Sequence, residues 1–273
     1  MPLIELPAGA TIFYEDSGQG RPLVMIHGWS MSGQVWRFQK PLADSFRLVI
    51  PDLRGHGRST APAGGCSLGD LTDDLAVLFE RLDLKDAVLL GWSLGSQIAL
   101  AAYPRLRERL AGLVLVGATP RFTMTEDYPC GHPAAEPRGM GLRLRRDFNR
   151  TMGEFFRGLF ASGELTREQE NRIAREIVMG GRLPAPAVAR ATLDILATAD
   201  LREMLPAVDL PVLLIHGSAD TVCHPSAAQY MAERLPDARL EIIDGAGHAP
   251  FLSRPVDFTM MLRKFLDGIH ADD

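Results

Sequence analysis

The 273-residue sequence has few cysteines, no long apolar run and no excess of positive charge. Its three cysteines, Cys66, Cys130 and Cys223, are far apart and odd in number, so they match neither a disulfide framework nor a regular metal site. Free thiols are typical of a reducing compartment. The net charge of −5 argues against general nucleic-acid binding.

Long hydrophobic segments are also missing. The most apolar window, residues 89–103, is interrupted by Gly, Ser and Gln, so it does not predict a membrane span. The first ten residues have neither a basic start nor an apolar core, and we expect no signal peptide. Apolar residues make up 46% of the chain and charged residues 23%, as in globular enzymes. We therefore expect a cytoplasmic monomer that binds neither membranes nor nucleic acid.

Strand-like and helix-like patterns alternate along most of the chain. Short apolar runs predict strands at residues 11–15, 22–26, 47–50, 86–90, 113–116, 211–215 and 239–243. Helical patterns occupy residues 68–82, 96–103 (ending before Pro104), 193–205, 226–235 and 257–269. This alternation predicts an α/β fold with a mostly parallel central sheet covered by helices on both faces.

Residues 121–190 differ from the rest, because they contain no strong strand pattern and show helical patterns at 148–160 and 167–179. We predict a helical lid at residues 121–192, inserted between core segments 1–120 and 193–273. Residues 121–190 carry twelve Arg, no Lys and nine Asp or Glu, a net charge of +3 on an acidic chain. Such a lid would suit an acidic partner, although a solvated face with paired charges has the same composition.

A G-x-S-x-G motif, Gly91-Trp92-Ser93-Leu94-Gly95, follows one predicted strand and precedes a helix. Chance matches occur in Gly-rich loops, but strand, motif and helix together are the context of a nucleophile elbow. In such an elbow a tight turn exposes the serine hydroxyl, and glycines let the strand and the helix approach closely. Ser93 is therefore the candidate nucleophile.

Two further groups follow predicted strands, and open α/β sheets place their sites at these strand ends. The chain order Ser93, Asp220, His248 is that of the α/β-hydrolase triad. His248 would accept the serine proton, and Asp220 would fix the imidazole tautomer. Asp244 is a rival acid, but it lies only four residues before His248 on the same loop. This chemistry needs no metal and no cofactor.

A tetrahedral intermediate needs two preorganised donors for its oxyanion. The backbone N–H of Leu94, directly after the nucleophile, is one candidate. The N–H of Trp29, in the loop that follows the strand at residues 22–26, is the other. The indole of Trp29 would then flank the acyl pocket, although it could be part of the core instead.

Several motifs together resemble the α/β-hydrolase superfamily. They are Ile26-His27-Gly28-Trp29, the segment from Asp52 to Ser59, the elbow, and the loops that carry Asp220 and His248. A serine at the nucleophile position is unlike the dehalogenases of this fold, which carry aspartate there. Ser96 follows the elbow where glycine is usual.

A narrower resemblance rests on Val35-Trp36-Arg37, the elbow, residues 194–202 and residues 248–253. They are similar to the BioH family, the pimeloyl-[acyl-carrier protein] methyl ester esterases of biotin synthesis. The resemblance implies a serine carboxylesterase that releases methanol from a pimeloyl chain held on acyl carrier protein. It also implies roles for two groups of residues. Substrate would contact Trp29, Ser93, Leu94, His248 and the lid aromatics Phe155, Phe156 and Phe160, and Arg150, Arg167 and Arg172 would dock the carrier.

Two other classes of function remain open from the sequence. A hydrolase of the same fold could act on another short-chain ester, a lactone or a carbon–carbon bond. A hydrolase-fold ligand receptor could keep the triad with little turnover.

Overall fold

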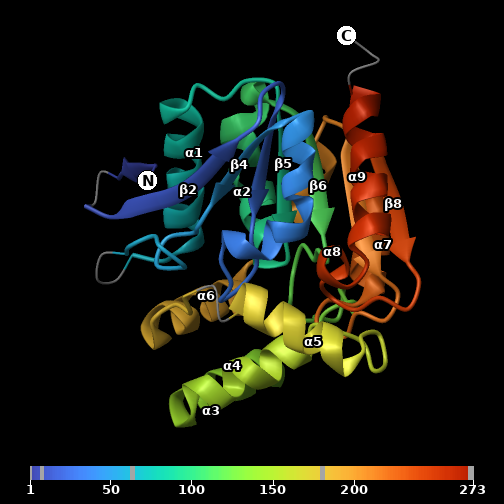
Figure 1. Cartoon of the computed structure of the whole chain (residues 1–273). Helices are drawn as coiled ribbons and strands as arrows, with labels where there is room; N and C mark the ends of the chain where they lie inside the picture. The colour runs from blue at the N-terminus through green and yellow to red at the C-terminus, as the bar shows by residue number, and fades with distance from the viewer. Residues whose placement is uncertain (1, 7–8, 62–64, 179–181, 270–273) are drawn as a thin grey trace.

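The computed structural model describes residues 2–6, 9–61, 65–178 and 182–269. Within them one eight-stranded sheet has the order β1-β2-β4-β3-β5-β6-β7-β8 (Figure 1). The β1–β2 and β2–β4 pairs are antiparallel, and all other pairs are parallel. The strands are β1 (Leu3–Glu5), β2 (Thr11–Ser17), β3 (Pro22–Ile26), β4 (Arg47–Pro51), β5 (Ala87–Trp92), β6 (Leu110–Val116), β7 (Val212–Gly217) and β8 (Ala238–Ile243). The predicted α/β fold class is confirmed.

Helices cover both faces of this sheet and its carboxyl edge. The α-helices are α1 (Leu68–Arg81), α2 (Leu94–Leu106), α3 (Ala135–Arg146), α4 (Phe148–Arg157), α5 (Arg167–Ile173), α6 (Pro186–Thr198), α7 (Pro225–Ala232), α8 (Pro250–Ser253) and α9 (Pro255–Ile269). Short 3₁₀ or π segments are η1 (Gly33–Asp44), η2 (Arg107–Arg109), η3 (Ala174–Val178) and η4 (Arg202–Ala207). No described helix is long and apolar enough to cross a membrane.

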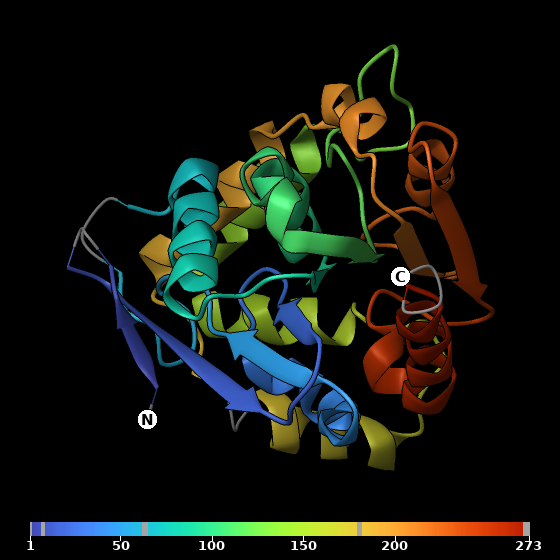
Figure 2. The same ribbon diagram turned by 90° about the horizontal axis from the view of Figure 1, so that it is seen from above.

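The hydrophobic core has two layers because side chains alternate along each central strand. Val24 and Ile26 of β3 pack in the layer that includes α1 and α2, whereas Leu23 and Met25 pack in the layer that includes η1 and α9. Figure 2 shows these helices on opposite sides of the sheet. Strands buried on both faces read as continuous apolar runs, which is why β3 to β7 were predictable; β8, at the edge of the sheet, is only partly buried.

Two predicted helix boundaries are wrong. Helix α2 continues through Pro104 to Leu106, because Tyr103 and Leu106 are buried and hold the last turn although Pro104 lacks a donor. The predicted helix at 193–205 is also wrong: α6 begins at Pro186 and ends at Thr198, and η4 is separate. Proline fits the first helical turn because the N–H that it lacks would have no helical partner there.

Helices α3 to α6 lie beneath the carboxyl edge of the sheet (Figure 1). Helix α3 contacts both α4 and α6. The sequence did not predict α3, because its first turn contains Pro137 and its middle contains Gly139 and Gly141. The carboxyl ends of β5, β7 and β8 therefore face helices α3 to α6, which we call the roof of the active site. The loops between the sheet and this roof carry the predicted site residues.

Candidate active site

Ser93 occupies the turn between β5 and α2, with φ 55° and ψ −116°. Positive φ is uncommon for a residue other than glycine, and such strain costs about 1–3 kcal/mol. A Cβ on Gly91 would lie 2.3 Å from the Gly95 oxygen, and one on Gly95 would lie 2.7 Å from the His27 oxygen. Both glycines are needed for this close approach, so the strand–turn–helix geometry is that of an elbow.

His248 and Asp220 meet beneath the sheet although 28 residues separate them. His248 Nδ1 lies 2.7 Å from Asp220 Oδ2, and both side chains are fully buried. Asp220 Oδ1 accepts hydrogen bonds from the backbone N–H groups of Val222 and Cys223 at 2.8 and 2.9 Å. Burial would raise the pKa of Asp220, but His248 and then His216 lower it well below its usual range. Asp220 is therefore an ionised acceptor that orients the imidazole.

A second imidazole contacts the same carboxylate. His216 Nε2 lies 3.2 Å from Asp220 Oδ2 and 2.7 Å from the Cys223 oxygen. Sequence reasoning missed this contact, although His216 is the last residue but one of β7 and lies only four residues before Asp220. The rival acid Asp244 is exposed and accepts from Ser218 Oγ at 3.1 Å.

The histidine side chain leaves its second nitrogen available. The Asp220 carboxylate can only accept, so His248 Nδ1 is the donor, and in the neutral imidazole Nε2 then carries the lone pair. This buried Nε2 has no hydrogen-bond partner among the described residues, so no bond to Ser93 is formed in this structure. Hydrogen bonds between a nucleophile and its base often tighten only when substrate binds. The arrangement can therefore accept a proton at Nε2.

The loop after β3 passes directly over the elbow. A Cβ on Gly28 would lie 3.2 Å from Ser93 Cβ and 2.9 Å from the Trp92 ring. The backbone N–H groups of Trp29 and Leu94 donate to no described residue. Trp29 is nevertheless mostly buried, and its indole donates to the Ala189 oxygen at 2.9 Å. Trp29 thus belongs to the core and lines the site at once.

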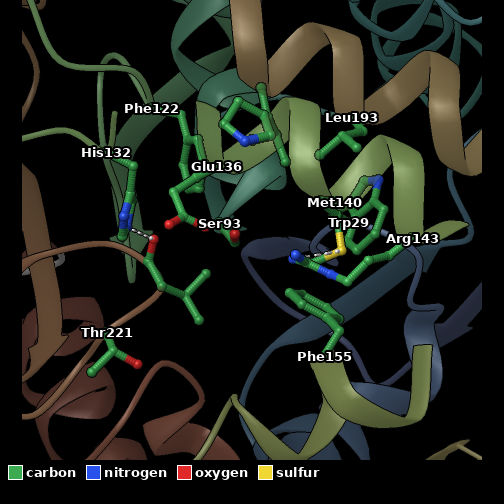
Figure 3. A pocket seen from close by; sticks show the side chains of 13 residues that line it. Trp29, Ser93, Phe122, His132, Glu136, Met140, Arg143, Phe155, Leu193 and Thr221 are labelled. Carbon is green, nitrogen blue, oxygen red and sulfur yellow. Dashed lines mark hydrogen bonds between the residues drawn. The ribbon is translucent and has the colours of Figure 1, made fainter. Parts of the chain in front are cut away.

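Ser93 opens into a cavity of about 150 Å³ beneath the helical roof. Figure 3 shows its lining: Trp29, Ser93, Phe122, His132, Glu136, Pro137, Met140, Arg143, Phe155, Leu193, Leu196, Thr221 and Val222. Most of these side chains are apolar, so the cavity suits a hydrocarbon chain.

The structure separates the three lid aromatics. Phe155 lines the cavity and packs edge-on against Trp29, with ring centroids 4.8 Å apart. Phe156 and Phe160 do not line it; they pack edge-on against each other, 5.7 Å apart, within the layer that includes η1 and α9. Phe155 is therefore the lid aromatic that lines this cavity, and contact of Phe156 and Phe160 with the acyl chain stays a prediction.

Helix α3 supplies two charged side chains that the sequence prediction missed. Glu136 and Arg143 line the cavity with Met140, and Figure 3 shows both charged groups directed toward it. Neither forms an ion pair with another described residue; Arg143 Nη2 lies 3.9 Å from the Met140 sulfur. The spacing i, i+4, i+7 places the three on one helix face, which is the signal that could have found them.

The predicted carrier-docking arginines are exposed and lie outside the cavity. Arg150 pairs with Glu154 on α4 at 2.8 Å, and Arg172 of α5 pairs with Glu176 at 3.1 Å. Arg167 is the exposed first residue of α5. A carrier protein would have to compete with two existing ion pairs, each weak because it is exposed.

The model of the alpha/beta hydrolase fold family matches residues 21–255. The chain belongs to this family. A pimeloyl-[acyl-carrier protein] methyl ester esterase from Nitrosomonas europaea is 39% identical over 250 residues, covering 91% of this chain and 97% of that protein. One of the same name from Edwardsiella ictaluri is 35% identical over 264 residues, covering 95% and 98%. These relatives confirm the narrower resemblance.

Solved structures of other esterases have the same fold as this α/β hydrolase. An esterase from Exiguobacterium antarcticum superposes with a TM-score of 0.90 at 29% identity, covering 97% of this chain and 98% of that one. A thermophilic esterase from Thermogutta terrifontis gives a TM-score of 0.84 at 30% identity, covering 98% of both chains. The predicted enzyme class, a carboxylic ester hydrolase, is confirmed.

Proposed function

We propose that this α/β hydrolase is the serine carboxylesterase that converts the methyl ester of pimeloyl-[acyl-carrier protein] into pimeloyl-[acyl-carrier protein] and methanol. The substrate is proposed because the chain is similar, over more than nine tenths of its length, to pimeloyl-[acyl-carrier protein] methyl ester esterases. The His248–Asp220 pair beneath the Ser93 elbow supports the choice of mechanism. We expect the enzyme to act as a cytoplasmic monomer with residues 121–192 as its lid.

The reaction uses an acyl-enzyme. His248 Nε2 takes the proton of Ser93 while Oγ attacks the ester carbonyl carbon. The N–H groups of Trp29 and Leu94 donate to the oxyanion, and Asp220 stabilises the imidazolium. The intermediate then expels the methoxy group, which leaves as methanol with the proton from His248. Water attacks the acyl-enzyme by the same route, and the free acid leaves as Ser93 regains its proton.

The cavity suits a substrate with polar groups at both ends of a hydrocarbon chain. Its apolar walls can hold the methylene groups, and Ser93 lies where the ester must bind. Arg143 lies close enough to Glu154 to help Arg150 lower the pKa of that carboxyl, but it forms no ion pair with a described carboxylate. Its guanidinium can donate to a carbonyl oxygen at the carrier end of the acyl group.

Arg143→Leu is expected to raise KM for the carrier-linked methyl ester about 10- to 150-fold, since a hydrogen bond that involves a charged group contributes about 1.5–3 kcal/mol. The kcat for p-nitrophenyl acetate should stay within about twofold, because that acyl group is too short to need the distant arginine. Steady-state kinetics on both substrates make the measurement. Arg145→Leu, on the same helix but outside the cavity, is the matched control; equal effects in the two variants would remove Arg143 from substrate binding.

Arg150, Arg167 and Arg172 are proposed to steer the acidic carrier to the lid. Replacing all three with Glu should raise KM for the carrier-linked ester by at least about tenfold at low salt, with kcat on a small free ester nearly unchanged. The effect should shrink with added salt, because screening lengths fall to about 8–10 Å at 0.10–0.15 M. The control is a second triple variant that makes the same change of charge near the amino ends of β5 and β6: Arg81→Glu, Lys85→Glu and Arg105→Glu. Equal losses in both triple variants would mean that net charge, and not this surface, attracts the carrier.

Growth of a biotin-requiring strain that lacks its own esterase tests the function in a cell. This gene should restore growth without biotin, and the Ser93→Ala variant should not. Restored growth by that variant, or no growth with the wild type when it is expressed, would contradict the proposal.

Repeated turnover of a p-nitrophenyl ester separates an enzyme from a ligand receptor, because a receptor would stop after about one equivalent of product.

A further inference from the structure

The loop between α4 and α5, residues 158–166, is bonded directly to the loop that carries His248. The backbone N–H of His248 donates to the Leu159 oxygen at 2.8 Å. The neighbouring N–H of Gly247 donates to Glu164 Oε2 at 2.9 Å. Two consecutive amides of the histidine loop therefore depend on acceptors from the roof of the active site.

Glu164 links the loop between α4 and α5 to the histidine loop through one carboxylate oxygen. Its Oε2 also accepts from Ala161 N–H at 2.6 Å, so a single carboxylate ties its own loop to Gly247. Its Oε1 is buried and has no hydrogen-bond partner among the described residues. A carboxylate that only solvates a surface loop keeps both oxygens in water. Glu164 instead has Oε1 buried without a hydrogen-bond partner in the described chain, so its position calls for another explanation.

Gly247 shows how closely the two loops approach. A Cβ there would lie 2.6 Å from the Leu159 oxygen and 3.0 Å from Glu164 Oε2. From the other side, a Cβ on Gly217 at the end of β7 would lie 2.1 Å from the Gly247 oxygen. The loop that carries His248 is thus held between the end of β7 and the loop that joins α4 to α5.

We propose that Glu164 is a positioning residue for His248 and couples the roof helices to the catalytic base. The proposal rests on the role of His248 in the proposed function. The coupling follows from connectivity, because this loop joins α4, which carries Arg150 and Phe155, to α5, which carries Arg167. A substrate or carrier that orders either helix also orders the acceptors of the Gly247 and His248 amides.

Glu164→Ala is expected to lower kcat for p-nitrophenyl acetate about 10- to 100-fold, since displacing a catalytic group by about 1 Å costs up to about 10²-fold. KM should change less than about twofold, because Glu164 does not line the cavity. Glu164→Gln keeps one carbonyl oxygen for both N–H groups and should restore kcat to within about threefold of wild type. Glu168→Ala, which removes an exposed carboxylate from α5, is the matched control.

The rate of fluorophosphonate labelling of Ser93 should follow kcat across these variants, because it also needs the base. A kcat within twofold of wild type in Glu164→Ala, or equal losses in Ala and Gln variants, would overturn the proposal. If Glu164→Ala does not fold, Glu164→Asp, one methylene shorter, gives the same comparison against Gln. Because p-nitrophenyl acetate carries no pimeloyl chain, failure of the wild type on the carrier-linked ester would refute the substrate and not this role of Glu164.

Discussion

Ser93→Ala is expected to abolish ester hydrolysis and labelling by fluorophosphonate. The serine hydroxyl is the proposed nucleophile, and alanine has no atom that can form the acyl-enzyme. Loss of the nucleophile of a triad typically lowers kcat by about 10⁴- to 10⁶-fold. Alanine should also leave the fold intact, because it is smaller than serine and Ser93 makes no side-chain hydrogen bond in the described structure. The φ of 55° is the same backbone strain for alanine as for serine. Hydrolysis of p-nitrophenyl acetate measures the loss.

Ser96→Ala is the matched control. Ser96 is buried one turn into the same helix, and its Oγ donates to the Ser93 oxygen at 2.5 Å. Removing this hydroxyl should keep turnover within about tenfold, because a neutral hydrogen bond contributes about 0.5–1.5 kcal/mol. Near-normal activity of Ser93→Ala would refute the whole mechanism.

Asp220→Asn is expected to lower kcat by about 10⁴-fold while the protein still folds. The asparagine oxygen can accept from Val222 and Cys223 in place of Asp220 Oδ1. Its amide group then faces His248 and His216, and an amide N–H there requires an acceptor at His248 Nδ1. The histidine proton would move to Nε2, and the base would lose the lone pair that it needs.

The control for this variant is Asp244→Asn. Asp244 is exposed and accepts only from Ser218 among the described residues, so its replacement should leave kcat within about twofold. Circular dichroism and thermal unfolding of both variants check that each of them folds. If Asp244→Asn were the damaging change and Asp220→Asn the mild one, the acid would be assigned wrongly.

The residues at the ends of strands could be predicted from the sequence because the signals are local. Ser93 lies between a buried apolar run and a helix, and Gly91 and Gly95 mark the close approach around it. The pairing of Asp220 with His248 could be predicted because each follows a strand, β7 or β8, in the chain order of the α/β-hydrolase triad. The contact of His216 with Asp220 was beyond this reasoning, because an apolar strand that ends in histidine gives no sign of the direction of that ring.

The roof of the active site was less predictable for a physical reason. Successive residues on an α-helix point about 100° apart, so Phe155 enters the cavity whereas Phe156 packs in the core. The sequence marked both as aromatic but did not fix how α4 is rotated about its axis. Helix α3 has an even weaker pattern, since one face lines a cavity and much of the rest is exposed. Glu136 and Arg143 were missed with it.

Hydrolysis of purified pimeloyl-[acyl-carrier protein] methyl ester tests the central claim most directly. The enzyme is incubated with this ester, and methanol and the free-acid carrier are quantified by gas chromatography and intact-protein mass spectrometry. We predict one methanol for each free-acid carrier, many turnovers per enzyme molecule, and no reaction with Ser93→Ala. An unchanged methyl ester in the presence of enzyme that still hydrolyses p-nitrophenyl acetate would contradict the account.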